Sequence, residues 1–267
     1  MPQLVICDID ATLVNEKKEL TPRTKEALIK LHEKGIYFGI ASGRPVDELK
    51  RNKERWDLPF DFDFVMGMNG AELWDGVHQK FYSYFMMEKE WLKETMEIMN
   101  VVECNPMVYW KGKIRCVRID DWMIHSASTS HKELEIVRLE DLYANENAKI
   151  MFRMKEEDMS KAEAWVKEHP NPYYHGFKTQ TTLLEFCDKR INKGYGLQKI
   201  CELNDMDLKD VMAFGDTSND NEMLKVAGCG VCMINGTDDT KACANAITTY
   251  DNDHDGLAIY LEESEIV

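Results

Sequence analysis

The feature that most constrains the fold of this chain is the alternation of short apolar runs with stretches of helical periodicity. Residues 4–7, 36–41 and 62–66 are apolar runs of strand length, and helical spacing of apolar residues fills 22–34 and 45–55. The alternation returns at Lys193, with a helix to about residue 204, a strand at 211–214 and a helix through Leu224. This order predicts a parallel sheet covered by helices on both faces, with right-handed crossovers.

The middle of the chain has a different pattern. Short β-rich runs at 72–84 and 107–119 are split by Asp75-Gly76 and Lys111-Gly112, which predicts hairpins. Helices at 88–100 and 156–168 and strands at 149–154 and near Cys187 are expected around them. The expected fold class is therefore α/β: a Rossmann-like three-layer core with a parallel sheet, formed by residues 1–82 and 189–267, plus an inserted α+β domain at 83–188.

Charge and composition exclude several classes of protein. The 33 Lys and Arg residues are outnumbered by 48 Asp and Glu, for a formal net charge of −15, so the surface repels a nucleic-acid backbone. No apolar run reaches the 18 residues of a membrane helix, and the N-terminal MPQLVICDID lacks the order of a signal peptide. We expect a cytoplasmic protein with no nucleic-acid or membrane partner, whose eight cysteines are reduced.

Polar clusters follow the expected strands at their carboxyl ends, where ligands bind in open α/β sheets. These clusters are Asp8-Ile9-Asp10, Ser42-Gly43-Arg44 and the segment 215–220, and Lys193 opens the helix after the insert. Carboxylates gathered at one sheet end repel each other unless a cation joins them, and carboxylate oxygens select hard cations such as Mg²⁺. Lys193 and the Ser42 hydroxyl suit an anionic group. Together these residues indicate a metal-assisted site for a phosphate.

Each of these signals has an ordinary structural explanation when taken alone. An Asp-x-Asp pair or a Ser-Gly-Arg segment after a strand is commonly a turn or a helix cap, and the joint occurrence in a consistent order favours the functional interpretation. Cys229 and Cys232 are spaced like half a zinc or redox site, but we interpret GCGVCMI as a core strand because no second pair accompanies it. Asn235-Gly236-Thr237 formally matches a glycosylation acceptor, to which we attach no meaning.

Four segments, DIDATL, ASGR, NKG and GDTSNDNEML, resemble the four motifs of the haloacid dehalogenase-like hydrolases. Their spacing resembles the Cof-type sugar-phosphatase branch, in which a large α+β cap lies between the second and third motifs. LTPRTKEAL, MNGAEL and the NDHDG ending at 252–256 support the resemblance. It covers both core segments and is weak inside the insert.

The resemblance implies catalytic roles for four residues. Asp8 would be the nucleophile that forms an aspartyl-phosphate. Asp10 would protonate the leaving alcohol and then serve as base for the hydrolytic water, with its backbone carbonyl on Mg²⁺. Ser42 would hydrogen-bond the transferring phosphoryl group, and Lys193 would neutralise the charge on Asp8 and the phosphate.

The resemblance also implies a cofactor and its contacts. The implied metal residues for Mg²⁺ are Asp8, Asp10, Asp216 and Asp220. The implied substrate or phosphate contacts are Thr12, Gly43, Arg44, Asn69 and Asn219. One departure is Ala11, which stands where the family usually has Gly; if that position needs a positive φ, the methyl group strains the loop.

The function expected from this resemblance is Mg²⁺-dependent hydrolysis of a small phosphate monoester, a sugar phosphate or another phosphorylated metabolite. We expect the insert to close over the site and select the leaving group. Its candidate pocket residues are Tyr109, Trp110, Lys111, Arg115, Tyr173, Tyr174 and His175. The alternatives are a sugar phosphomutase that uses the same nucleophile and a non-catalytic sensor of phosphorylated metabolites. The oligomeric state is left open between monomer and homodimer.

Overall fold

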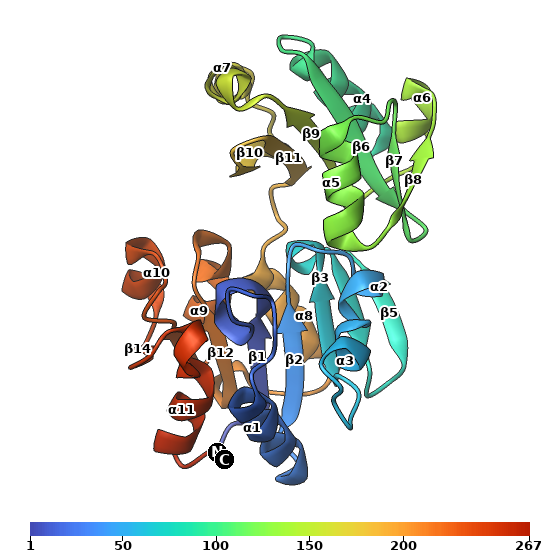
Figure 1. The fold of residues 1–267 in the computed structure, drawn as a ribbon. Coiled ribbons are helices and arrows are strands. Elements are labelled where there is room, and N and C mark those ends of the chain that lie inside the picture. The colour runs from blue at the N-terminus through green and yellow to red at the C-terminus, as the bar shows by residue number, and fades with distance from the viewer. The chain divides into compact units, whose positions relative to one another are not determined.

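A computed structural model describes residues 1–267 and divides the chain into two compact units (Figure 1). Residues Met1–Ser83 and Ile191–Val267 form the core unit, and Tyr84–Arg190 form the insert unit. These boundaries fall one or two residues from those expected from the sequence. None of the helices combines the length and the apolar character that a membrane crossing requires.

An eight-stranded sheet organises the core unit. The strands lie in the order β14-β13-β12-β1-β2-β3-β4-β5. Their bounds are β1 (Leu4–Asp8), β2 (Tyr37–Ala41), β3 (Phe64–Gly67), β4 (Glu72–Asp75), β5 (Lys80–Ser83), β12 (Val211–Gly215), β13 (Cys229–Cys232) and β14 (Ala246–Ile247). From β14 to β3 every pair is parallel, whereas β4 and β5 are antiparallel, so the expected parallel sheet is extended at one edge by a hairpin.

Helices cover both faces of this sheet, which confirms the expected three-layer α/β class. Their bounds are α1 (Pro22–Glu33), α2 (Val46–Leu49), α3 (Asn52–Arg55), α8 (Lys193–Leu203), α9 (Asn221–Val226), α10 (Asp238–Cys243) and α11 (Gly256–Glu263). Apolar residues of α1 and α11 pack on the face that carries Val5 and Val65. Successive strand residues point to opposite faces, and Met66 accordingly contacts Gly196 of α8 on the other side.

Local sequence explains where these helices begin and end. The Thr21 side chain accepts a hydrogen bond from the backbone N–H of Thr24, and Pro22 occupies the first helical position of α1. Gly35, with φ +72°, follows the end of that helix. The single helix expected up to Arg55 is instead two short helices, α2 and α3, interrupted at residues 50–51.

The insert unit is an α+β layer with a sheet of its own. Six strands lie in the order β10-β11-β9-β6-β7-β8, and all pairs are antiparallel except β7–β8. The strands are β6 (Cys104–Trp110), β7 (Lys113–Cys116), β8 (Glu133–Ile136), β9 (Lys149–Met154), β10 (Tyr174–Gln180) and β11 (Leu183–Asp188). The helices are α4 (Lys89–Met99), α5 (Asp121–Ser130), α6 (Leu139–Leu142) and α7 (Glu156–Glu168).

Strand β9 shows how the insert sheet separates two apolar clusters. Its residues Ile150 and Phe152 pack with side chains of α4 and α7, while Met151 packs on the opposite face with Met123 of α5. The bounds expected for β9 and α7 agree with the structure, whereas α5, β8 and α6 were not expected.

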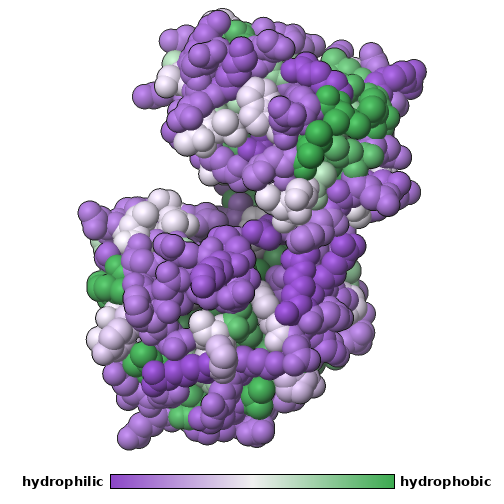
Figure 2. Space-filling model, viewed as in Figure 1, coloured by the Kyte–Doolittle hydropathy of each residue, from purple (hydrophilic) through white to green (hydrophobic).

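The visible surface of both units is mainly hydrophilic (Figure 2), as expected for a chain in which 30% of the residues are charged. On the insert unit, apolar colour gathers where Figure 1 places α5 and β8. Exposed residues of these two elements include Ile124 and Ile136, which are 54% and 60% exposed.

Candidate active site

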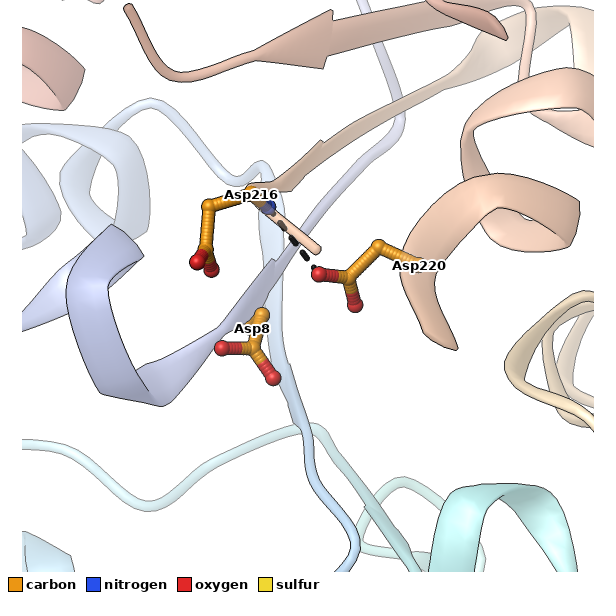
Figure 3. A group of neighbouring side chains, drawn as sticks. All are labelled: Asp8, Asp216 and Asp220. Carbon is orange, nitrogen blue, oxygen red and sulfur yellow. Dashed lines mark hydrogen bonds between the residues drawn. The ribbon is translucent and has the colours of Figure 1, made fainter. Parts of the chain in front are cut away.

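The first acid of the site is placed by the central strand. Asp8 is the last residue of β1, and Asp216 follows directly after β12, its parallel neighbour, in which Phe214 pairs with Cys7. Because carboxyl ends of parallel strands meet at one edge of a sheet, both acids lie there with Asp220 of the next turn. One carboxylate oxygen from each of the three lies within 4.8 Å of the others, and all three residues are buried (Figure 3).

A turn at Ile9–Leu13 follows Asp8. Within it, Ala11 has φ 59° and ψ 10°, a left-handed conformation in which the alanine methyl group strains the loop. The turn directs the Thr12 hydroxyl to Asp216, where it donates a 2.8 Å hydrogen bond to Oδ1. Thr12, expected to contact substrate, is therefore placed on an acid of the cluster.

The loop after β12 folds back on itself through Asp220. Its Oδ2 accepts hydrogen bonds from the backbone N–H groups of Asp216 (3.0 Å, dashed in Figure 3) and Thr217 (3.2 Å). Only glycine fits at position 215, since a Cβ there would lie 2.6 Å from Cγ of Asp220. The Gly-Asp-x-x-x-Asp spacing thus builds a tight turn that presents two carboxylates together.

Lys193 supplies the cation that contacts this cluster. Asn192 caps α8 by accepting from the N–H of Tyr195, so that Lys193 occupies the first turn. Its ammonium donates to Oδ1 of Asp8 and to Oδ1 of Asp220 (2.6 Å), and the residue is fully buried. Burial lowers the pKa of Lys193, but the two carboxylates outweigh burial and raise that pKa above its ordinary value.

The carboxylates outnumber the ammonium in this buried space. Burial, together with Asp220 and Asp216, raises the pKa of Asp8 well above its usual range despite Lys193. Burial raises the pKa of Asp216 to about 6. When all three carboxyls are ionised they exceed the one ammonium by two negative charges, and an all-oxygen donor set of this kind fits a hard divalent cation such as Mg²⁺.

Asp10 was expected among the metal residues, but its carboxylate pairs with two basic side chains and is not part of the cluster of Asp8, Asp216 and Asp220. It accepts from Arg44 (3.0 Å to Oδ2) and pairs with Lys18 (2.9 Å to Oδ1). Burial raises the pKa of Asp10, but Arg44 and Lys18 outweigh it and hold the pKa below its usual value. A metal contact through the backbone carbonyl of Asp10 remains a prediction.

The second expected cluster lies at the end of β2, next to β1 in the sheet. Ser42 is 5% exposed, and its hydroxyl oxygen accepts from the N–H of Arg44 (3.3 Å). Its carbonyl accepts from the N–H of Asn69, whose φ of 54° curls the chain after β3. Asn219 donates to Oδ1 of Asn69 at 3.4 Å, and Gly43 packs against the same Asn69 amide. The expected substrate contacts of the core unit therefore surround the ends of β1, β2, β3 and β12.

Sequence reasoning missed three residues that contact the acid-bearing loops. Lys18 pairs with Asp10, and the Asn235 amide donates to the carbonyl of Ala11 at 2.8 Å. The N–H of Thr237 donates to the carbonyl of Asp216 at 2.8 Å. No spacing signal reveals the Asn235 contact, because Asn235 is 224 residues from its partner.

Comparison with known proteins identifies the family of this chain. The family model described as haloacid dehalogenase-like hydrolase matches residues 5–261. The chain belongs to this family. The expected family and the expected hydrolase class are confirmed.

Relatives of this haloacid dehalogenase-like hydrolase match it along almost its whole length. The 5-amino-6-(5-phospho-D-ribitylamino)uracil phosphatase YitU of Bacillus subtilis is 27% identical, covering 98% of this chain and 97% of its own. A second B. subtilis phosphatase named for the same substrate, YcsE, is 26% identical, covering 96% of this chain and 93% of its own. The crystal structure of a haloacid dehalogenase-like hydrolase from Bacteroides thetaiotaomicron superposes with a TM-score of 0.88 at 25% identity, covering 99% of this chain and all of that one.

Several aromatic residues of the insert have structural partners within their own unit. Tyr174 is 2% exposed and donates its hydroxyl hydrogen to Glu94 (3.1 Å). Tyr173 stacks on Trp91 with ring centroids 5.2 Å apart. The guanidinium of Arg115 lies over Trp110, 5.0 Å from the ring centre.

Proposed function

We propose that this protein is a Mg²⁺-dependent phosphatase that hydrolyses a small phosphate monoester through an aspartyl-phosphate on Asp8. The observation that carries the proposal is the buried cluster of Asp8, Asp216 and Asp220 around the ammonium of Lys193. Such a cluster supports phosphoryl transfer, which depends mainly on positioning and on stabilising negative charge. When bound, Mg²⁺ supplies the positive charge that the cluster lacks and polarises a phosphoryl oxygen.

Asp8 is the nucleophile of the proposed reaction. Lys193 holds one of its oxygens and fixes the orientation of the carboxylate at the end of β1. A carboxylate oxygen attacks phosphorus, a P–O bond to Asp8 forms and the bond to the leaving alcohol breaks. Water then attacks the same phosphorus, which releases inorganic phosphate and restores the free carboxylate.

Asp10 moves the protons in both steps. It gives a proton to the leaving alcohol oxygen and takes one from the attacking water, a contribution typically worth 10²–10⁴-fold in rate. Arg44 and Lys18 hold Asp10 ionised in the substrate-free site. A phosphate dianion that pairs with Arg44 weakens this hold, and Asp10 then takes up the proton that it must donate.

The proposed substrate class is a sugar phosphate or a similar phosphorylated metabolite. The B. subtilis relative acts on a 5-phospho-D-ribitylamino compound, in which the phosphate sits on a polyhydroxylated chain. We assign the choice of leaving group to the insert unit, which the chain places between the Ser42 and Lys193 motifs. The rate ratio between two sugar phosphates, measured for the intact enzyme and for variants of insert residues, tests this assignment.

The decisive experiment measures phosphate release from an aryl phosphate with and without Mg²⁺, for the wild type, Asp8→Asn and Asp61→Asn. Asp61, whose side chain is 85% exposed and pairs with Lys53, is the matched control for loss of one carboxylate. We expect release that needs the metal, disappears in Asp8→Asn and persists in Asp61→Asn. Release by Asp8→Asn at the wild-type rate would contradict the assignment of the nucleophile.

Product analysis separates the phosphatase from a phosphomutase, because both use the same Asp8 chemistry. Incubation with a hexose phosphate yields inorganic phosphate from the former and an isomeric hexose phosphate from the latter. Binding of phosphate without turnover of any substrate would instead identify a sensor.

A further inference from the structure

The loop Met233–Thr237, which follows β13, contacts both acid-bearing loops of the site. The Asn235 side chain donates from Nδ2 to the carbonyl of Ala11 (2.8 Å), beyond Asp8 and Asp10. Two residues later, the N–H of Thr237 donates to the carbonyl of Asp216 (2.8 Å). This single loop therefore joins the turn after β1 to the turn after β12.

The Ala11 carbonyl that Asn235 contacts belongs to the most strained residue of the turn. With φ 59°, Ala11 is left-handed, a conformation in which the Cβ of a non-glycine residue is crowded against its own backbone. The next residue is Thr12, whose hydroxyl donates to Oδ1 of Asp216. If Ala11 relaxes toward negative φ, Thr12 turns away from this acid.

The loop that carries Asn235 is held in place by other contacts. The N–H of Ile234 donates to the hydroxyl of Thr248 (3.0 Å), which is buried, and the N–H of Gly236 donates to Met233 (2.8 Å). A Cβ on Gly236 would lie 2.6 Å from Sγ of Cys232, so the chain fits closely here. The backbone around Asn235 is thus held by hydrogen bonds and close packing, while its side chain contacts the left-handed Ala11.

We propose that Asn235 is a positioning residue, whose amide holds Ala11 in the left-handed conformation and so keeps the Thr12 hydroxyl on Asp216. The consequence for metal binding and catalysis rests on the proposed function, while the consequence for the turn does not. A glycine at position 11 adopts positive φ at little cost. The amide of Asn235 therefore compensates for the strain of an alanine at position 11.

The test is a double-mutant cycle of Asn235→Ala and Ala11→Gly. Three quantities are measured: the Mg²⁺ dissociation constant of the substrate-free enzyme by calorimetry, kcat and KM for an aryl phosphate, and backbone hydrogen exchange of residues 9–14. We expect Asn235→Ala to weaken Mg²⁺ binding about ten-fold, equivalent to about 1.4 kcal/mol, and to accelerate exchange in the turn. In the Ala11→Gly background the same substitution should weaken binding no more than about two-fold.

Asn252→Ala is the matched control for the loss of one amide. Asn252 donates from Nδ2 to the carbonyl of Val14 at 2.9 Å, and Val14 is extended with φ −110°. The effect of Asn252→Ala should be the same in the wild-type background and in the Ala11→Gly background, because the Asn252 amide holds no left-handed residue.

Equal effects of Asn235→Ala in the two backgrounds, or unchanged exchange at 9–14, would overturn the inference. A wild type that neither binds Mg²⁺ nor releases phosphate would refute the proposed function. The hydrogen-exchange cycle would in that case still decide whether Asn235 holds the turn.

Discussion

Asp216→Asn should make the metal-free protein more stable while abolishing the Mg²⁺ binding proposed above. The pKa of the Asp216 carboxyl is about 6, mainly because the group is buried, against about 3.9 for an aspartate in an unfolded chain. Asparagine has the same size and keeps an oxygen that accepts the hydrogen bond from Thr12. The substitution therefore removes the buried charge with little change in packing.

The magnitude follows from the two pKa values. Below pH 4 the carboxyl is protonated in the folded and unfolded protein, so its burial costs nothing there. Between pH 4 and 6 the unfolded chain releases its proton while the folded protein retains it, and stability falls. Above pH 6 both are ionised, and the folded state carries a penalty of about 3 kcal/mol. Urea unfolding in EDTA should show that Asp216→Asn is more stable than the wild type by up to this amount at pH 7.5. At pH 4 the two proteins should have nearly the same free energy of unfolding.

Mg²⁺ and a second acid provide the controls. A metal concentration one hundred times the dissociation constant should stabilise the wild type by about 2.7 kcal/mol and leave Asp216→Asn unchanged. Asp239 is exposed and accepts from Ser218 and Asn221 (2.8 Å each), and its pKa is lowered to about 2, chiefly by Thr237. Asp239→Asn should therefore be less stable at pH 7.5, with the deficit shrinking as the pH falls toward 2. An Asp216→Asn protein less stable than the wild type at pH 7.5 in EDTA would refute the reasoning.

Three further substitutions test other parts of the site. Lys193→Met leaves two buried carboxylates without their cation and should lower the free energy of unfolding in EDTA by about 3–5 kcal/mol and kcat by at least 10²-fold; an unfolding curve like that of the wild type would count against the ion-pair geometry. Gly215→Ala places a Cβ against the Asp220 carboxyl and should lower the free energy of unfolding by about 1–3 kcal/mol. Calorimetry should then detect no Mg²⁺ binding, whereas unchanged affinity would mean that the turn can widen. Thr12→Val removes the donor to Asp216 and should weaken Mg²⁺ binding roughly three- to ten-fold. The KM for an aryl phosphate at saturating metal should stay constant.

The arrangement of the acids could be predicted from the sequence because it depends on a periodic signal. Short apolar runs, each followed by polar residues, predict parallel strands whose carboxyl ends meet. The structure accordingly brings together Asp8, Asp216 and Lys193, residues far apart in the chain. The tight turn at Gly215 is equally local, because Asp220 folds back on its own loop.

Other elements have no comparable signal. Helix α5 reads DWMIHSASTS, in which Ser and Thr are weak helix formers, and it is set by the Asp120 cap and by packing of Met123. Strand β8 has four residues at a sheet edge, too few for a clear alternation. The direction of the Asp10 carboxylate depends on Arg44 and Lys18, and side-chain contacts of this kind carry no periodicity.

The position of β1 in the sheet determines when this enzyme can acquire its site during synthesis. Leu4 of β1 pairs with Val211 of β12, so one edge of the first strand made has no partner until the ribosome has added more than two hundred residues. The insert unit, in contrast, pairs all of its strands within Tyr84–Arg190 and has its complete sheet before β12 exists. A chain that terminates between these two points therefore carries a finished insert, an exposed strand edge prone to aggregation, and no active site.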